Sequence, residues 1–159
     1  MLFRSYVSQL KSTGKDLFAV VRTANKSAAQ LQDLLTGTRL MHMANAEIVN
    51  RYAPMGNSRC GYSQVAILAS ASSGESLRLL REKYKDIFLL MDGCDHPNAN
   101  AKNCSFGFDR LGHGAAACCG ESITAAWKNA TMPEVEYVAA AVEAAMRLKK
   151  NLLRYVTIL

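Results

Sequence analysis

Four short apolar runs, at residues 17–21, 64–69, 87–91 and 115–118, constrain the fold of this chain more than any other feature. Each run has about the length of a β-strand, and continuous apolar runs are typical of parallel strands that are covered on both faces. A helical pattern follows each run, and no hairpin signal lies between them. Strands that alternate with helices predict an α/β fold with a parallel sheet, built from four successive β/α units.

The helices expected between these strands have recognisable breaks and caps. Gly14 ends the first helix, Ser27 caps a short one, and Gly37 breaks the chain before the next. Residues 92–103 are predicted to form a long polar loop. The last helix begins with residues 131–134, which have capping-box spacing and an early proline. The expected helices span residues 2–12, 27–34, 39–52, 75–84, 106–111, 121–127 and 133–155.

The length of 159 residues predicts a single domain that spans residues 1–159. A complete (β/α)8 barrel needs about 250 residues, so this chain has the element count of about half of one. The expected fold class is therefore α/β, a partial TIM barrel. A half-barrel has open sheet edges and an exposed apolar inner face, which must be paired or covered. We expect protein subunits to be the partners that cover them.

The chain is basic, with 19 Lys and Arg residues against 13 Asp and Glu, a net charge of +6 and a pI near 9.2. This balance suits contact with nucleic acid, an anionic membrane surface or acidic partners. The C-terminal helix either touches RNA or acidic lipid head groups or has a solvated end, which is the simpler interpretation. Its basic residues are Arg147, Lys149, Lys150 and Arg154. No apolar run approaches the roughly 18 residues needed to cross a membrane.

The N-terminal segment, residues 1–15, contains Arg4, Lys11 and Lys15 and no acidic residue. It either resembles a weak mitochondrial presequence or forms an amphipathic surface helix, which is the favoured interpretation. The expected location is mitochondrial, and otherwise cytoplasmic.

The five cysteines contain no Cys-x-x-Cys pair, and no secretory signal peptide precedes them, so we expect reduced thiols. Potential metal ligands gather in one loop region: Asp92, Cys94, Asp95, His96 and Cys104. A zinc site has four ligands at recognisable spacing, which this loop lacks, so we expect no metal and no cofactor. Cys118 and Cys119 are interpreted as small buried residues and not as a reactive pair.

The segment from Gly112 to Trp127 joins a short apolar run to a helix through a glycine turn at Gly120. In an α/β protein this strand–turn–helix geometry presents free backbone N–H groups, which suit a phosphate or a carboxylate. The segment is therefore the candidate anion-binding site, and the acidic Glu121 at the start of its helix bears directly on that interpretation.

Four segments resemble the bacterial-type orotidine 5'-phosphate decarboxylases, in order and with compatible spacing. Residues 22–33 are similar to the R-T-S-N-x-S-x-x-x-Q loop of that family, and residues 62–82 to its G-V-x-x-V-G-A-T strand and the L-x-x-L-R-E helix that follows. Residues 89–93 lie where the family has L-L-x-P-G-x-G-x-Q-G, and residues 112–127 where it has G-x-G-x-x-V-N-x-S-R-x-I-x-x-A-W. The resemblance covers roughly residues 5–150 and maps onto the second half of the family's barrel.

This resemblance implies an ancestral nucleotide site from which the chain departs. The family's catalytic D-x-K-x-x-D motif lies in the first half of the barrel and does not occur here, so no catalytic residue is expected. The serine that meets the pyrimidine corresponds to Ala24, the phosphate-loop glutamine to Pro97, and the phosphate-binding arginine to Glu121. The degenerate ligand-site positions are Ala24, Ser70, Ser72, Gly93, Pro97, Gly120 and Glu121.

Of these departures, the change from arginine to Glu121 is expected to weaken nucleotide binding most. A charge-assisted hydrogen bond contributes about 1.5–3 kcal/mol, whereas a like charge about 4 Å from a phosphate costs on the order of 4 kcal/mol at an effective dielectric near 20. Replacing this favourable hydrogen bond by this repulsion would weaken nucleotide binding by several powers of ten. We therefore expect that the ancestral anion site no longer binds a nucleotide.

These features together predict a non-catalytic structural or accessory subunit of a larger complex. The expected host is a mitochondrial assembly, such as a ribosome or a respiratory complex. The first alternative is a decarboxylase-type lyase of pyrimidine biosynthesis, active only with a partner chain that supplies the lysine motif. The second alternative is an RNA-contacting subunit, which rests on charge alone.

Overall fold

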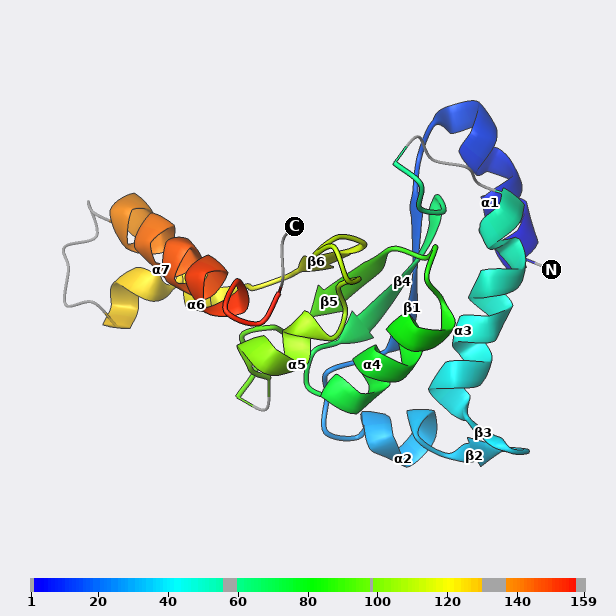
Figure 1. The fold of residues 1–159 in the computed structure, drawn as a ribbon, viewed down its shortest axis with the longest axis horizontal. Helices are drawn as coiled ribbons and strands as arrows, with labels where there is room; N and C mark the ends of the chain where they lie inside the picture. Colours follow the sequence, from blue (N-terminus) through cyan, green and yellow to red (C-terminus); the bar gives the residue numbers. More distant parts are fainter. Residues whose placement is uncertain (1, 56–59, 98, 130–136, 157–159) are drawn as a thin grey trace.

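A parallel four-stranded sheet lies at the centre of the structure, a computed structural model that describes residues 2–55, 60–97, 99–129 and 137–156. The strands pair in the order β1-β4-β5-β6, which is also their order along the chain (Figure 1). This arrangement confirms the predicted parallel sheet of a partial barrel. The strands are β1 (Leu17–Arg22), β4 (Val65–Ser70), β5 (Leu89–Asp92) and β6 (Ala115–Ala117).

Helices cover one face of this sheet. α3 (Met41–Tyr52) packs on β1 and β4, and α4 (Gly74–Lys83) packs beside α5 (Ala101–Ser105). α1 (Leu2–Thr13) lies along α3, on the side of the sheet away from β6 (Figure 1). Among the described residues, no helix is both long enough and apolar enough to cross a membrane.

The covered face forms the hydrophobic core. The parallel register places Ala19, Ile67 and Leu89 in one row across the first three strands. Ile67 and Leu89 are fully buried, and so are Leu77 and Leu80 on the inner side of α4. The apolar side chains at helical spacing therefore hold α4 on the sheet, as the sequence pattern predicts.

The opposite face of the sheet carries no helix in the described part of the chain and stays partly exposed. Its register aligns Val20 with Leu68, Leu68 with Leu90, and Leu90 with Ala116, so one apolar row crosses all four strands. Val20 is 58% exposed, and Phe18, two residues earlier on the same face, is 40% exposed. We call this surface the open face, and its residues are Phe18, Val20, Leu68, Phe88, Leu90 and Ala116.

A small hairpin corrects the expectation that the chain contains none. β2 (Leu35–Thr36) pairs antiparallel with β3 (Arg39–Leu40), and Gly37 between them has a φ of 65°. A two-residue hairpin turn needs positive φ, which glycine adopts without steric cost. Gly37 was predicted only to break a helix, but it lies in the turn of this hairpin. α3 therefore begins at Met41, two residues later than predicted.

The predicted helix at residues 106–111 is wrong, and a helix lies instead at Ala101–Ser105, inside the predicted polar loop. The side chain of Asn100 explains this start, because its oxygen accepts the backbone N–H of Asn103 at 2.8 Å. Asparagine is a strong N-cap residue, so the signal for α5 was present in the sequence and was read as part of a loop.

α6 is shorter than predicted, and α7 ends at Leu152, three residues before the predicted end. α6 spans only Glu121–Thr124 and is followed by a 3-10 turn at Ala126–Asn129, whereas one helix over residues 121–127 was expected. α7 spans Tyr137–Leu152 within the predicted range of 133–155, and the capping box at residues 131–134 lies outside the described residues. Both helices lie beyond the β6 edge of the sheet and contact each other (Figure 1).

A buried arginine on α4 binds together the chain segments that enter β5 and β6. Arg81 is only 8% exposed. Its Nε donates to the Gly107 carbonyl at 2.8 Å, and its Nη2 donates to the Gly114 carbonyl at 2.5 Å. Its Nη1 donates to three further carbonyls, at 3.0–3.2 Å, which belong to Tyr84, Lys85 and Ile87. One guanidinium therefore satisfies carbonyls from three separate segments.

Replacing this arginine by methionine tests its structural role. R81M would leave buried carbonyls without donors, and we expect the free energy of unfolding to fall by about 3–5 kcal/mol. The matched control is R78M on the same helix, where the exposed Arg78 pairs only with Glu75 and Glu82. The control should lose less than about 1 kcal/mol. Urea unfolding of both variants measures the difference, and equal losses would contradict the assigned role.

Candidate functional site

The predicted ligand-site positions lie at the carboxyl ends of the four strands. Ala24 follows β1, Ser70 ends β4, Gly93 follows β5, and Gly120 follows β6. Since parallel strands end at the same edge of a sheet, these positions share one side of the molecule, where barrel enzymes place their active sites. Ala24 and Gly93 are neighbours, because a Cβ placed on Gly93 would lie 3.4 Å from the Ala24 Cβ. Ser72 and Pro97 follow in the adjoining loops, and Glu121 is the first residue of α6.

The backbone amides at the glycine turn are occupied by a carboxylate of the chain itself. Asp95 Oδ2 accepts the N–H of Gly120 at 2.8 Å, the N–H of Ser122 at 3.2 Å and the hydroxyl of Ser122 at 3.0 Å. We call these three donors the cradle. The sequence predicts that this turn suits a phosphate or a carboxylate, but it indicates Asp95 only as a candidate metal ligand; the contact of Asp95 with the cradle is visible only in the fold.

The charge of Asp95 is stabilised by the cradle. Partial burial alone would raise the pKa of Asp95, but the hydrogen bonds from Ser122 and Gly120 outweigh burial and lower it below its ordinary value. Glu121 lies between these two donors in the sequence and adds a second acidic side chain at the same turn. A phosphate entering the cradle would therefore have to displace one carboxylate and approach another.

The loop after β1 is closed by its own polar residues. Arg22 donates through Nε and Nη2 to the two carboxylate oxygens of Asp33, at 3.1 and 2.8 Å. The hydrogen bond from Arg22 is the largest influence on Asp33 and lowers its pKa. The buried His42 adds a contact, with Nδ1 3.1 Å from Asp33 Oδ1. Thr23 and Gln32 bond to each other through the Thr23 N–H and both side chains. This loop is thus held in shape by internal contacts.

The serines after β4 are also engaged with each other. The hydroxyls of Ser70 and Ser72 lie 2.8 Å apart, and the Ser72 N–H donates to Ser70 Oγ at 3.0 Å. Ser70 is fully buried. The structure therefore brings the predicted positions to one edge of the sheet, where Ser70 and Ser72 bond to each other and Gly120 bonds to Asp95.

Two cavities flank the sheet. One, of about 750 Å³, opens beside the cradle between α5, α6 and α7, and its lining includes Cys94, Asp95, Cys118 and Lys149. The other, of about 910 Å³, lies at the amino ends of the strands. There the Tyr62 hydroxyl donates to Asp109 Oδ2 at 2.6 Å, and burial, followed by this hydrogen bond, raises the pKa of Tyr62 to about 12.

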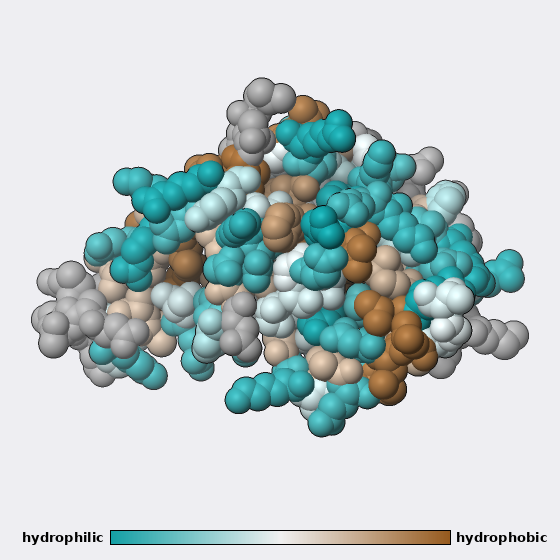
Figure 2. Space-filling model, turned by 60° about the horizontal axis from the view of Figure 1, so that its bottom comes forward, coloured by the Kyte–Doolittle hydropathy of each residue, from teal (hydrophilic) through white to brown (hydrophobic). Residues whose placement is uncertain are grey.

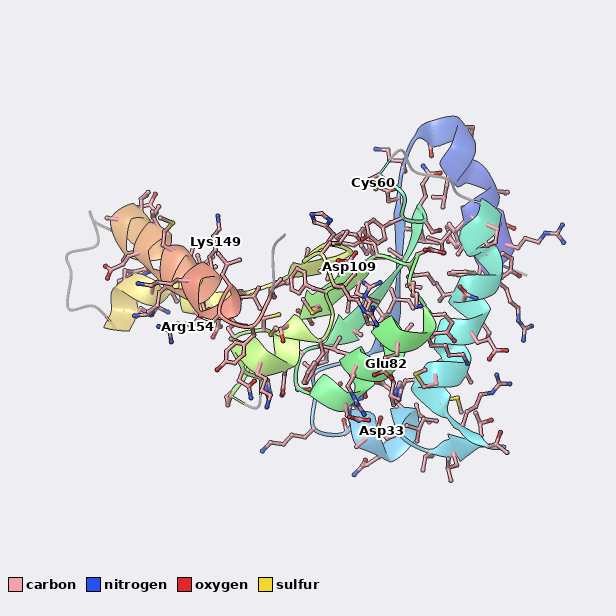
Figure 3. The ribbon with its side chains drawn as sticks, in the orientation of Figure 1. Asp33, Cys60, Glu82, Asp109, Lys149 and Arg154 are labelled. Atoms are coloured by element: carbon pink, nitrogen blue, oxygen red, sulfur yellow. The ribbon has the colours of Figure 1, made fainter. Side chains whose placement is uncertain are left out.

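Several of the charged side chains labelled in Figure 3 lie in different parts of the molecule. Figure 3 shows Lys149 and Arg154 at the α7 end of the structure, far from Asp33 on the loop after α2 (Ala28–Gln32) and from Glu82 on α4. Within the described ranges, no group of three His, Cys, Asp or Glu residues is arranged to hold a metal ion.

Removing the internal anion tests the cradle directly. D95A should lower the Tm at pH 7 by about 2–8 °C, because charge-assisted hydrogen bonds worth about 1–2 kcal/mol are lost. Since the pKa of Asp95 is lowered on folding, its contribution is fully present above the ordinary value of 3.8 and is lost as the pH falls through the lower, folded value. The Tm difference from the wild type should therefore shrink as the pH falls from 5 towards 2.5. D92N, outside the cradle, is the control; an unchanged Tm in D95A at pH 7 would contradict the interaction.

Comparison with known proteins agrees with the motif resemblance. No family model matches the chain. The orotidine 5'-phosphate decarboxylase of Clostridium kluyveri is 28% identical over 154 residues, which are 94% of this chain and 51% of that protein. The decarboxylase of Petrotoga mobilis is 25% identical over 126 residues, which are 78% of this chain and 43% of that protein. The chain thus spans about half the length of the curated relatives that it matches.

Solved structures show the same fold. A Toxoplasma gondii protein assigned as an orotidine monophosphate decarboxylase matches with a TM-score of 0.70 at 19% identity, over 92% of this chain and 54% of its own. The Leishmania donovani OMP decarboxylase matches with a TM-score of 0.63 at 21% identity, over 87% of this chain and 48% of its own. Motifs, strand order and both comparisons lead to one conclusion: the chain is a homologue of the orotidine 5'-phosphate decarboxylases with the fold of a partial TIM barrel.

Proposed function

We propose that this chain is a non-catalytic accessory subunit that binds another protein through the open face of its sheet. The exposed apolar row on that face carries the proposal. Val20 and Phe18 are too exposed for core residues, and Val20 belongs to a row that crosses every strand of the sheet. Contiguous apolar surface of this kind marks a protein-binding site.

The edges of the sheet support the same conclusion. β1 and β6 each pair on one side only within the described sheet, so each leaves a row of backbone N–H and C=O groups without a strand partner. An unpaired edge next to an apolar face is a template for another strand. A partner that adds strands at these edges would bury the open face and satisfy the edge hydrogen bonds together.

The helix α7, beyond the β6 edge, carries an exposed apolar stripe of its own. Val138, Val142 and Met146 are spaced four residues apart on α7 and are each more than half exposed. Residues at this spacing lie on one face of a helix. A partner that pairs with β6 would lie next to this face, so the sheet and α7 can share one interface.

A separate apolar patch lies at the other end of the molecule. Figure 2 shows apolar residues gathered over α2 and the β2–β3 hairpin, where Leu31, Leu34 and Leu35 are all more than half exposed. This second patch is distant from α7 and supports a place within a larger assembly of protein subunits.

The kind of partner follows from the architecture. The relatives continue for about as many residues again outside the matched region, and a closed barrel needs about eight strands where this sheet has four. We therefore propose a partner with parallel β/α units, which would complete a barrel-like sheet around the open face. A mitochondrial host and contact of the basic α7 end with RNA stay predictions from the sequence.

We propose that the chain is not catalytic because the residues at the carboxyl ends of its strands do not suit a nucleotide. Asp95 already holds the cradle, and Glu121 adds a like charge that costs a phosphate on the order of 4 kcal/mol. Ala24 lacks the hydroxyl that the resemblance expects there, and Pro97 lacks both the side-chain amide and a backbone donor. Each change removes a favourable contact with a nucleotide, and none adds one.

The alternative is a decarboxylase-type lyase, which the names of the curated relatives favour. In that case a partner chain would have to supply the lysine motif, and a bound phosphate would have to displace Asp95 from the cradle. A pyrimidine mononucleotide distinguishes the two functions, because binding to the folded state at 100 times Kd stabilises it by about 2.7 kcal/mol.

We expect no rise in Tm when uridine monophosphate is added at millimolar concentration. The measurement is made on the purified chain and on its complex isolated from cells, so that a partner's contribution is included. A rise of about 5–10 °C in either sample would contradict the non-catalytic function and favour the lyase.

A charge on the open face tests the binding surface. V20E places a carboxylate in the middle of the apolar row, and because Val20 is exposed, the Tm should change little. In affinity purification from the source cell, V20E should lose the proteins that co-purify with the wild type. The matched control is I48E, an equally apolar residue that is 48% exposed on α3, away from the open face. Retention of the partners by V20E would overturn the proposed surface.

A further inference from the structure

A small polar cavity lies where α5 meets the C-terminal end of α7, two helices that contact each other (Figure 1). It has a volume of about 390 Å³, and we call it the α5–α7 pocket. All but one of its lining residues have side chains that can donate hydrogen bonds, and no acidic residue lines it in the described part of the chain. The lining residues are Asn100, Ala101, Lys102, Asn151, Arg154 and Tyr155.

The two cations of this pocket have no acidic partner. Among the ion pairs of the described residues, none includes Lys102 or Arg154, and both residues are exposed. The dipole of α7 accounts for cations near the end of that helix, such as Lys149 and Lys150, but not for Lys102, which lies on α5. The positive charge of the pocket is therefore available to an anionic ligand.

The backbone fixes both sides of the pocket. On the α5 side, Asn100 Oδ1 accepts the Asn103 N–H at 2.8 Å, so the amide group that Asn100 can still offer a ligand is its NH2 donor. On the α7 side, the N–H groups of Tyr155 and Val156 donate to the Leu152 carbonyl at 3.0 and 3.2 Å, and Val156 is buried. This turn leaves Tyr155 54% exposed at the pocket.

We propose that the α5–α7 pocket binds single-stranded RNA, with a backbone phosphate between Lys102 and Arg154 and an unpaired base stacked on Tyr155. Phosphate oxygens only accept hydrogen bonds, so they suit a pocket of cations and amide donors. Base stacking on an exposed aromatic ring is the usual companion of such phosphate contacts in proteins that bind single strands. The sequence predicts contact with RNA from charge alone, whereas the structure gives it a site.

A neighbouring cavity extends the path of the strand. The cavity between α5, α6 and α7 shares Asn100 and Asn151 with the pocket, and Lys149 lines it as well. Lys149 can therefore meet a second phosphate of the same strand. The acidic residue of that cavity, Asp95, is bonded to the cradle. A mononucleotide would meet only part of this surface, so it should bind far more weakly than a strand.

The arrangement favours a single strand over a duplex or a membrane. A base that stacks on a side chain must be unpaired, which excludes the interior of a duplex. Helices that lie on anionic membranes carry cations along an exposed apolar stripe. On α7 the exposed Val138 and Val142 lie in the first two turns, whereas Arg154 follows the opposite end of the helix.

The salt dependence of RNA binding tests the phosphate contacts. Fluorescence anisotropy of a labelled oligouridine of about 12 nucleotides measures Kd on the purified full chain. Three phosphate contacts give a slope of about −2 for log K against log salt, so Kd should rise about twentyfold between about 50 and 200 mM salt. K102Q/R154Q removes two contacts, so its slope should be smaller by about 1.4.

The matched control removes the same charge from the other end of the sheet. K85Q/R110Q changes two exposed cations that line the cavity at the amino ends of the strands, together with Glu82, Asp86 and Asp109. Its Kd should stay within about threefold of the wild type, with the slope unchanged. Equal losses in the two double variants would show general attraction to a basic protein and overturn the proposed site.

Two substitutions of Tyr155 test the stacking. Y155A should raise Kd about 5- to 100-fold, the effect of one lost stacking contact, and leave the salt slope unchanged. Y155F keeps the ring and should bind as the wild type does. Wild-type affinity in Y155A would contradict the assigned stacking.

Other ligands decide between the single strand and its competitors. Because Lys102, Arg154 and Tyr155 are exposed, the Tm of their variants should match that of the wild type, so lost binding reports the pocket and not misfolding. Equal affinity for a duplex RNA of the same length would overturn the proposal, and so would no binding to the single strand at about 50 mM salt. Tighter binding to phosphatidylserine vesicles that K102Q/R154Q abolishes would assign the pocket to a membrane. None of these results bears on the open face, which V20E tests separately.

Discussion

The position of β6 beside β5 depends on one buried cation, Arg81, which binds carbonyls from the end of α4 and from the segments that enter β5 and β6. The packing around it leaves little room. A Cβ on Gly114 would lie 2.9 Å from the Tyr62 ring and 3.1 Å from Arg81 Nη2, and Gly114 has a φ of 78°. A Cβ on Gly107 would lie 2.3 Å from Met91 Sδ. Glycine is therefore required at both positions, and the arginine fixes the strands whose far ends form the cradle.

The backbone donors of the cradle are satisfied from within the chain. Backbone N–H groups at a glycine turn need an acceptor when water is partly excluded, and Asp95 provides one within the chain. This contact stabilises the turn and the start of α6 from within the chain. Together with Glu121 it makes the turn acidic, which opposes the charge of a phosphate. The turn is therefore supported by a side chain of the chain itself.

The sequence predicted the architecture well and the site contacts poorly, for identifiable reasons. The four apolar runs determine four parallel strands because each must be buried on one face at least. α5 was missed because Asn100, its cap, stood in a polar stretch that resembled a loop, and the hairpin was missed because Gly37 serves equally as a helix break and as a turn. The contact of Asp95 with the cradle joins residues that are 25 or more positions apart in the sequence, so only the fold could reveal it.

The open face is the feature that connects this fold to a function. We propose that a partner covers the apolar row, the two edges left unpaired in the described sheet and the exposed apolar face on α7. Hydrogen exchange on the isolated chain and on its complex from the source cell tests this most directly. If the open face is covered by a partner that adds strands, the amides of β1 and β6 will exchange at least about tenfold more slowly in the complex. Equal exchange of both strands in the two samples would contradict the account.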